Sequence, residues 1–178
     1  MSNLCQHKSA VQADPLSGEY MNGLYGYAMV LTRNHAEAED LVQETYVRAI
    51  PALCRLRPES NIKAWLFKIL RNIWLNQLRK RRSDPQMVPS DEESGSLDNL
   101  VTPGKNSYEI YAGEVERKRV RAAIQELPME SREIILLREF EELSYQEIAN
   151  LLGCPQGTVM SRLARARSKL RALLADVQ

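Results

Sequence analysis

Residues 143–171 read LSYQEIANLLGCPQGTVMSRLARARSKLR, and no other stretch of the chain is as informative. Its apolar residues recur at helical spacing in two stripes, separated by a turn of about four residues. Ser144 can cap the first helix, Gly153 is placed to end it, and Pro155 discourages its continuation. The layout therefore predicts a helix-turn-helix. Its two stripes are Tyr145, Ile148, Ala149 and Leu152, then Val159, Leu163, Ala166 and Leu170.

The second of these helices carries a polar and basic surface away from its apolar stripe. Short hydroxyls and long cations suit the base edges and phosphates of a DNA major groove. Residues 155–178 contain five Lys or Arg and one acid. Paired amphipathic helices also occur in proteins that do not bind DNA, but this charge favours DNA binding. The candidate contacts are Thr158, Ser161, Arg162, Arg165 and Lys169.

The net charge of +1 conceals an uneven distribution along the 178 residues. Residues 1–82 carry 12 Lys or Arg and 7 acids, residues 83–113 carry 1 and 6, and residues 114–178 carry 11 and 10. Basic ends around an acidic middle suggest two modules that face nucleic acid and a spacer that does not.

The acidic middle also has the composition of a linker. Residues 83–107 contain three Pro and two Gly with little apolar periodicity, which predicts a flexible connection between two domains. Its acidic run is most simply solvated, but it could also repel DNA or occupy a basic surface in place of DNA. We expect an N-terminal domain at 1–82, a flexible acidic linker at 83–109 and a C-terminal domain at 110–178.

Helical periodicity without any alternating strand pattern predicts an all-α fold. In the N-terminal domain we expect helices at about 16–32, 35–50 and 62–82, with Asn34 and Asn61 as caps. Met21, Leu24, Ala28 and Leu31 should face inward from the first helix. In the C-terminal domain we expect helices at about 110–126 and 130–141, the latter with the apolar residues Ile134 and Leu137 and the neighbouring Ile135, Leu136 and Phe140. With the helix-turn-helix they make a four-helix unit.

The helix at 62–82 is apolar on two sides, so neighbours should cover both. Residues 61–83 include no acid and seven cations, which favours phosphate contacts over a basic helix end that merely complements the helix dipole. Trp65 and Phe67 should serve mainly packing, whereas Trp74 is undecided. The preceding polar segment, residues 55–61, could form a pocket for an extruded base.

The helix at 35–50 has a polar side formed by Asp40, Gln43, Glu44 and Arg48. Such a surface is ordinarily solvated, but in a protein with basic surfaces at both ends it could also dock on another protein.

Several function classes find no support in the sequence. Three widely spaced cysteines without a CxxC pair give no metal site, and we expect no cofactor. No paired carboxylates, nucleophile–base pair or phosphate-binding glycine loop indicates an enzyme. There is no apolar run of 18 residues and no basic-then-apolar leader, so we expect no membrane insertion and a cytoplasmic protein.

The motifs together resemble the extracytoplasmic-function group of bacterial RNA polymerase sigma factors, over about residues 17–82 and 110–175. AEAEDLVQETYVRAI resembles the family's polymerase-binding segment, and NIKAWLFKILRNIWLNQLRKRRS resembles its segment for recognising and melting the −10 element. The helix-turn-helix resembles its −35 reader. One departure is Asn76, which stands where the family often has Asp, so any ion pair of that Asp is in doubt.

The resemblance implies a role for each matching residue. Polymerase binding would fall to Asp40, Gln43, Glu44 and Arg48. Contacts to the −35 element would fall to Gln156, Gly157, Thr158, Ser161, Arg162, Arg165 and Lys169. Contacts to the −10 element would fall to Arg55, Arg57, Asn61, Lys63, Lys68, Arg71, Asn72, Asn76, Arg79 and Lys80.

The implied function is promoter-specific initiation of transcription by an alternative sigma factor. Its implied partners are core RNA polymerase, through the clamp helices and the flap region, promoter DNA, and an anti-sigma factor. A polymerase-independent helix-turn-helix regulator is the alternative, although it does not explain the cation-rich helix at 62–82. A protein that only binds other proteins would not need the basic face of the recognition helix.

Overall fold

The computed structural model describes residues 18–57, 59–83 and 107–175, with side chains described from Tyr20 to Ser83 and from Glu116 onward. Within these residues the chain contains helices and no strand, which confirms the predicted all-α class. The helices are α1 (Gly18–Thr32), α2 (His35–Ala49), the 3₁₀ helix η1 (Ile50–Arg55), α3 (Ile62–Ser83), α4 (Ser107–Glu126), α5 (Met129–Ile135), the π-helix η2 (Leu136–Phe140), α6 (Tyr145–Leu152) and α7 (Gln156–Ala175).

Helices α1, α2 and α3 form the N-terminal half. Asn34 caps α2 as expected, because its side-chain oxygen accepts a hydrogen bond from the backbone N–H of Glu37. The amide oxygen of Asn61 likewise accepts from the N–H of Ala64 at the start of α3. The core centres on Tyr27 of α1 and Phe67 of α3, whose ring centroids lie 5.2 Å apart.

Helix α1 turns a different residue outward than we expected. Leu24, Ala28 and Leu31 are buried, but Met21 is 48% exposed and the prediction that it faces inward is wrong. Tyr27 is fully buried instead. The inward stripe is therefore centred on Tyr27, and Met21 lies at its margin near the start of the helix.

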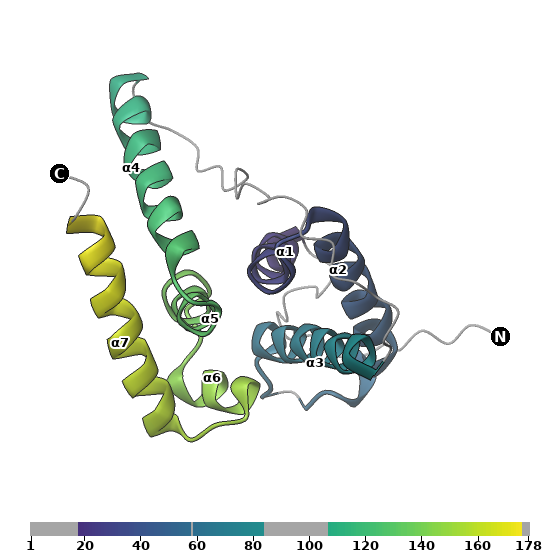
Figure 1. Ribbon diagram of the computed structural model, residues 1–178. Helices are drawn as coiled ribbons and strands as arrows, with labels where there is room; N and C mark the ends of the chain where they lie inside the picture. Colours follow the sequence, from purple (N-terminus) through teal and green to yellow (C-terminus); the bar gives the residue numbers. More distant parts are fainter. Residues whose placement is uncertain (1–17, 58, 84–106, 176–178) are drawn as a thin grey trace.

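Helices α4 to α7 form the C-terminal half, with α4 alongside α7 and α5 and α6 between this pair and the N-terminal half (Figure 1). Pro128 separates α4 from α5. The core of this half is built by residues that include Ile134, Leu137, Ile148, Val159, Leu163 and Ala166, all at most 1% exposed.

The helix expected at 130–141 is not one α-helix. It changes at Leu136 into the π-helix η2, where the N–H of Glu141 donates to the carbonyl of Leu136, five residues earlier. The wider turn rotates later residues away from the face that Leu137 occupies. Phe140 is 49% exposed, although it belongs to the same apolar group in the sequence.

The two halves are in contact, through α1 with α5 and α3 with α6. Helix α3 therefore has neighbours on two sides, as its two apolar stripes predict, and one of them belongs to the other half. The predicted linker falls largely on residues 84–106, which lie outside the described residues; α3 runs to Ser83 and α4 begins at Ser107. No helix in the described ranges is long and apolar enough to cross a membrane.

Candidate nucleic-acid interface

The helix-turn-helix is fixed at both ends of its first helix, α6. The hydroxyl of Ser144 accepts from the N–H of Glu147 at 3.2 Å, and the Glu147 carboxylate accepts from the N–H of Ser144 at 2.8 Å. This reciprocal pair is a capping box. At the other end Gly153 has φ 68°, the left-handed conformation that lets the chain turn sharply into α7.

Helix α7 buries Val159, Leu163 and Ala166 and presents its opposite face to solvent. Because the turn is short and α6 is packed against α7, this face projects from the molecule. Five of the residues predicted to read the −35 element are exposed and two, Thr158 and Arg162, are half-buried. The exposed ones are Gln156, Gly157, Ser161, Arg165 and Lys169.

Arg167 of the same helix has a different environment. Its guanidinium pairs with Glu139 at 2.6 Å, and the hydrogen bond that it donates to that carboxylate raises its pKa above the ordinary value. Arg138 lies over the ring of Tyr145, 4.8 Å from its centroid, and donates to the carbonyl of Leu143. These cations tie α7 and α6 to η2, whereas Arg165 is exposed and donates to the carbonyl of Ser161 within α7.

On helix α3 the buried residues are apolar, and most of the cationic and amide residues are exposed. Leu66, Phe67, Leu70 and Ile73 are buried, which confirms Phe67 as a core residue. Trp65 and Trp74 are half-buried against the core. Most cationic and amide side chains predicted to contact the −10 element are exposed on α3 and on the segment before it. The exposed ones are Arg55, Arg57, Asn61, Lys68, Asn72, Asn76, Arg79 and Lys80.

Two of the predicted −10 cations are half-buried and engaged by the other half of the protein. The Lys63 amine lies 2.8 Å from the carboxylate of Glu141. The Arg71 guanidinium lies 2.9 Å from the carboxylate of Glu133. Sequence reasoning predicted these cations but missed their acidic partners, since nothing in the local pattern marks Glu133 or Glu141 as different from a solvated acid.

Glu133 is also the hydrogen-bond partner of a buried tyrosine. The Tyr27 hydroxyl donates to the Glu133 carboxylate at 2.7 Å, on the same oxygen that Arg71 contacts. Burial, together with the charge and hydrogen bond of Glu133, raises the pKa of Tyr27 well above its ordinary value, and Arg71 offsets part of that effect. Tyr27 therefore remains a neutral donor at physiological pH.

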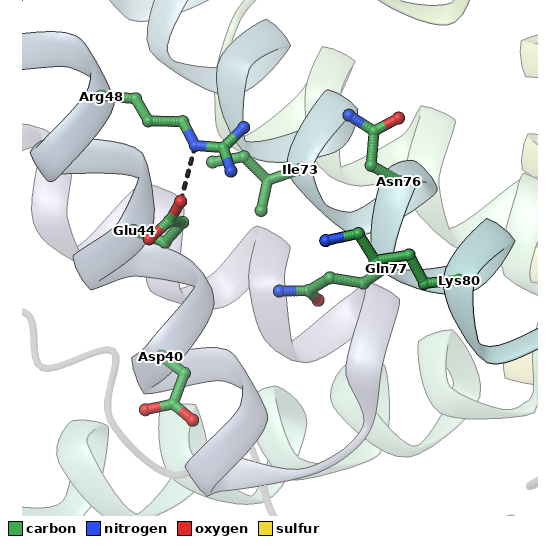
Figure 2. Close-up of a pocket in the computed structure, with 7 residues that line it drawn as sticks. All are labelled: Asp40, Glu44, Arg48, Ile73, Asn76, Gln77 and Lys80. Carbon is green, nitrogen blue, oxygen red and sulfur yellow. Dashed lines mark hydrogen bonds and ion pairs between the residues drawn. The ribbon is translucent and has the colours of Figure 1, made fainter. Parts of the chain in front are cut away.

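The predicted polymerase-binding residues lie on one side of α2, where Asp40, Gln43 and Arg48 are exposed and Glu44 is half-buried. Arg48 pairs with Glu44 at 2.6 Å along the helix. A groove runs between this side of α2 and the later turns of α3 (Figure 2). The residues that line it are Asp40, Glu44, Arg48, Ile73, Asn76, Gln77 and Lys80.

The groove places predicted polymerase-binding and predicted −10 residues next to each other. Asp40 and Glu44 line its α2 side, and Asn76 and Lys80 line its α3 side (Figure 2). Asn76 accepts a hydrogen bond from Arg79 at 3.2 Å. An amide can therefore orient a cation at the position where the family often has Asp. Among the described residues no group of three or more His, Cys, Asp or Glu is placed to hold a metal ion.

Two family descriptions match the chain, one in each half. "Sigma-70 region 2" matches residues 16–83 and "Sigma-70, region 4" matches residues 117–170. The region 2 match covers α1 to α3 and the region 4 match covers most of α4 to α7.

Proteins with similar sequences are named as sigma factors. The ECF RNA polymerase sigma factor EcfG of Rhodopseudomonas palustris is 39% identical over 152 residues, which cover 85% of this chain and 78% of that protein. The ECF RNA polymerase sigma factor SigM of Bacillus subtilis is 33% identical over 161 residues, 90% of this chain and 93% of that protein.

Two solved structures have similar folds. The sigma factor RpoE in complex with the anti-sigma factor NepR from Bartonella quintana has a TM-score of 0.64 and 32% identity, covering 90% of this chain and 94% of that one. The structure of CnrH in complex with the cytosolic domain of CnrY has a TM-score of 0.57 and 28% identity, covering 92% and 87%.

Proposed function

The chain belongs to the ECF group of RNA polymerase sigma factors, and from this premise we propose which of its residues perform each step of promoter recognition. As a member of that group, it directs core RNA polymerase to initiate transcription at specific promoters. The proposal concerns the division of this work among α2, α3 and α7.

Helix α7 reads the −35 element as duplex. Its exposed polar face carries an amide, hydroxyls and cations, which can donate to and accept from base edges and pair with phosphates. Arg165 and Gln156 are exposed at positions suited to base edges, and Lys169 suits the flanking backbone. The observation that carries this assignment is that the face opposite the buried Val159, Leu163 and Ala166 is solvent-exposed.

Helix α3 and the segment before it hold the opened −10 element. Lys68, Arg79 and Lys80 are exposed cations that can follow the backbone of a single strand. The segment before α3 supplies Arg55, Arg57 and Asn61 for an extruded base. These contacts must offset the loss of base stacking, about 1.4 kcal/mol for each base-pair step.

Helix α2 docks on core polymerase through Asp40, Gln43, Glu44 and Arg48. Three of the four are exposed, and charges of this kind at the rim of an interface give specificity and speed association. Because the same groove includes Asn76 and Lys80, docking on polymerase would also fix the end of α3 that faces the −10 element. The C-terminal half would contact the polymerase flap.

The protein acts by binding, without catalysing a reaction of its own, and works in the cytoplasm, where polymerase and promoter are present. An anti-sigma factor is a further expected partner, because the similar sigma factor RpoE is found in complex with the anti-sigma factor NepR, and CnrH with the cytosolic domain of CnrY.

The −35 assignment is tested with reconstituted holoenzyme and duplex promoter DNA. Arg165→Ala should weaken binding by about 1–3 kcal/mol, with relaxed preference at one base pair, if this side chain reads a base. Arg162→Ala should act in the same direction. Arg167→Ala is the matched control, because Arg167 is paired with Glu139 inside the C-terminal half. Equal binding by the Arg165 and Arg167 variants at low salt would reject the assignment.

A further inference from the structure

Three side chains assigned to the −10 surface are held by carboxylates of the C-terminal half. In each case the group from the N-terminal half is a hydrogen-bond donor or a cation, and the group from the C-terminal half is a glutamate. The pairs are Arg71 with Glu133 at 2.9 Å, Lys63 with Glu141 at 2.8 Å, and Asn61 with Glu147 at 2.6 Å.

The first contact is part of the packed interior. The Glu133 side chain is 6% exposed and the Arg71 side chain is 18% exposed. Tyr27 donates to the same carboxylate from the core of the N-terminal half. A carboxylate buried to this extent needs its partners, because an unpaired buried charge is strongly unfavourable. Both partners of Glu133 belong to the N-terminal half. The docked arrangement is therefore more favourable than one in which Glu133 stays buried without them.

The second contact depends on the absence of a side chain at Gly23. A Cβ atom at Gly23 of α1 would come within 2.6 Å and 2.9 Å of the two carboxylate oxygens of Glu141. The absence of a side chain at Gly23 thus makes room for the carboxylate that pairs with Lys63. Gly26, one turn further along α1, offers a contrast, because a Cβ atom there would meet nothing within 4 Å.

The third contact joins two helix starts. One oxygen of Glu147 accepts from the side-chain amide of Asn61, and the other completes the capping box of α6 with Ser144. Asn61 in turn caps α3. The contact thereby fixes the first helix of the helix-turn-helix against the beginning of the −10 surface.

These glutamates compete with DNA for the same partners. Carboxylates and phosphates both bind Arg and Lys through charge-assisted hydrogen bonds, so one side chain cannot serve both fully. The DNA-facing residues of α7, in contrast, stay exposed in this arrangement. The docked form therefore covers part of the −10 surface and leaves the −35 reader accessible.

We propose that the free protein is held closed by Glu133, Glu141 and Glu147, which occupy −10-binding side chains until the two halves separate. This inference rests on the −10 assignment proposed above. Separation releases Asn61, Lys63 and Arg71 from these carboxylates together, so capture of the opened strand and opening of the protein are coupled steps.

The test compares Gly23→Glu with Gly26→Glu in the full chain. Both variants add one acidic side chain to α1, so helix propensity and net charge change equally, but only the first displaces and repels Glu141. Closure is measured by energy transfer between dyes on Cys54 and Cys154, one thiol in each half, after Cys5→Ser. We expect wild type and Gly26→Glu to share one transfer efficiency and Gly23→Glu to show a clearly lower one.

A second readout is binding of a fluorescent 20-nucleotide single strand of randomised sequence, measured by anisotropy at low salt. We expect Glu141→Gln to bind about tenfold more tightly than Glu139→Gln; this pair is used for binding because the carboxylate added by Gly23→Glu can itself pair with Lys63. Equal transfer efficiency in all three proteins would overturn the closure. Lower transfer without tighter binding would overturn the masking of the −10 surface.

A second pair of variants covers the case in which Gly23→Glu does not fold, as judged by circular dichroism. Glu141→Gln removes the charge that holds Lys63, whereas Glu139→Gln removes a charge whose partner, Arg167, belongs to its own half. The same two readouts apply, with the same expected direction.

Failure of the −10 assignment can be told apart from failure of the closure. The assignment is tested in holoenzyme by Lys68→Ala with Arg79→Ala, two exposed cations that make none of the three contacts. If that variant opens promoter DNA as well as wild type, the assignment is wrong whatever the energy transfer shows. If it loses opening while Gly23→Glu and Gly26→Glu show the same transfer efficiency as wild type, the closure alone is wrong.

Discussion

At the scale of single residues, Glu147 illustrates how one carboxylate can support two kinds of structure. Burial alone would raise its pKa, but hydrogen bonds from the hydroxyl and N–H of Ser144 and from Asn61 outweigh burial and lower the pKa below 4.5. The ionised form is thus the one that both caps α6 and holds Asn61.

The lowered pKa of Glu147 predicts how stability depends on pH. A carboxyl group whose pKa falls on folding contributes stability above its unfolded pKa, and that contribution is lost as pH falls through the folded value. We expect the free energy of unfolding of wild type to exceed that of Glu147→Gln at pH 7, and the difference to shrink as pH drops below about 4.5. Urea unfolding across this range measures it.

Gln is the appropriate replacement because it can still complete a capping box. The variant keeps one acceptor oxygen for Ser144, but its NH2 group cannot accept from Asn61, so only the pH-dependent part of the difference reports the ionisable group. A difference between the two proteins that stays constant from pH 7 to pH 3.5 would contradict the proposed ionisation.

At the scale of elements, the turn between α6 and α7 depends on Gly153. Its φ of 68° is a conformation that L residues rarely adopt. We expect Gly153→Ala to lower the free energy of unfolding by about 1 kcal/mol or more, measured by urea unfolding. Gly157→Ala, inside α7 with open space around it, should instead be neutral or stabilising. Equal destabilisation by both would show that backbone conformation is not the cause.

Helix α2 gives a second prediction at this scale. Asp40→Ala combined with Glu44→Ala should lower the affinity for core polymerase by about tenfold, which corresponds to about 1.4 kcal/mol. Loss of the exposed Glu44–Arg48 pair costs only about 0.3–0.5 kcal/mol, so the fold should survive. Quantitative pull-down with core polymerase measures the change.

Glu39→Ala is the matched control for that experiment, since Glu39 is an exposed acid on α2 that does not line the groove. If the double variant and this control bind polymerase equally, the docking surface lies elsewhere on the protein.

Local elements were largely predictable from the sequence because their causes are local. Apolar periodicity places most helices, and the caps Asn34, Ser144 and Gly153 act through neighbouring backbone groups. The π-helix η2 was not predicted, because no glycine or proline interrupts residues 130–141. It stands where Leu137 and Leu143 are both buried and the N–H of Leu143 donates to the carbonyl of Leu137, contacts that no local sequence signal marks.

At the scale of the whole molecule, the docking of the halves could not be predicted. Arg71 and Glu133 are 62 residues apart and Asn61 and Glu147 are 86 apart, and the residues between them include the predicted linker. Periodicity carries no information about which acid meets which cation across such a distance. The sequence did suggest that an acidic segment might cover a basic surface, but the acids in contact belong to the C-terminal half.

The docked and the separated states of the protein differ in which DNA-binding surfaces are accessible. In the docked state α7 is accessible and part of the −10 surface is not. In the separated state both surfaces are available, and the two halves can reach sites at different places along the duplex. Polymerase and opened DNA should therefore bind the separated state preferentially, and each shifts the population by its difference in affinity for the two states.

The most direct test of the division of work between α3 and α7 is run-off transcription by reconstituted holoenzyme on a library of promoters randomised at −35 and −10. We expect wild type to select both elements, Arg165→Ala to lose selection at −35 only, and Lys68→Ala with Arg79→Ala to lose transcript yield through failure to open −10. If wild type selected no promoter, or if both variants kept the wild-type selection and yield, the account would be contradicted.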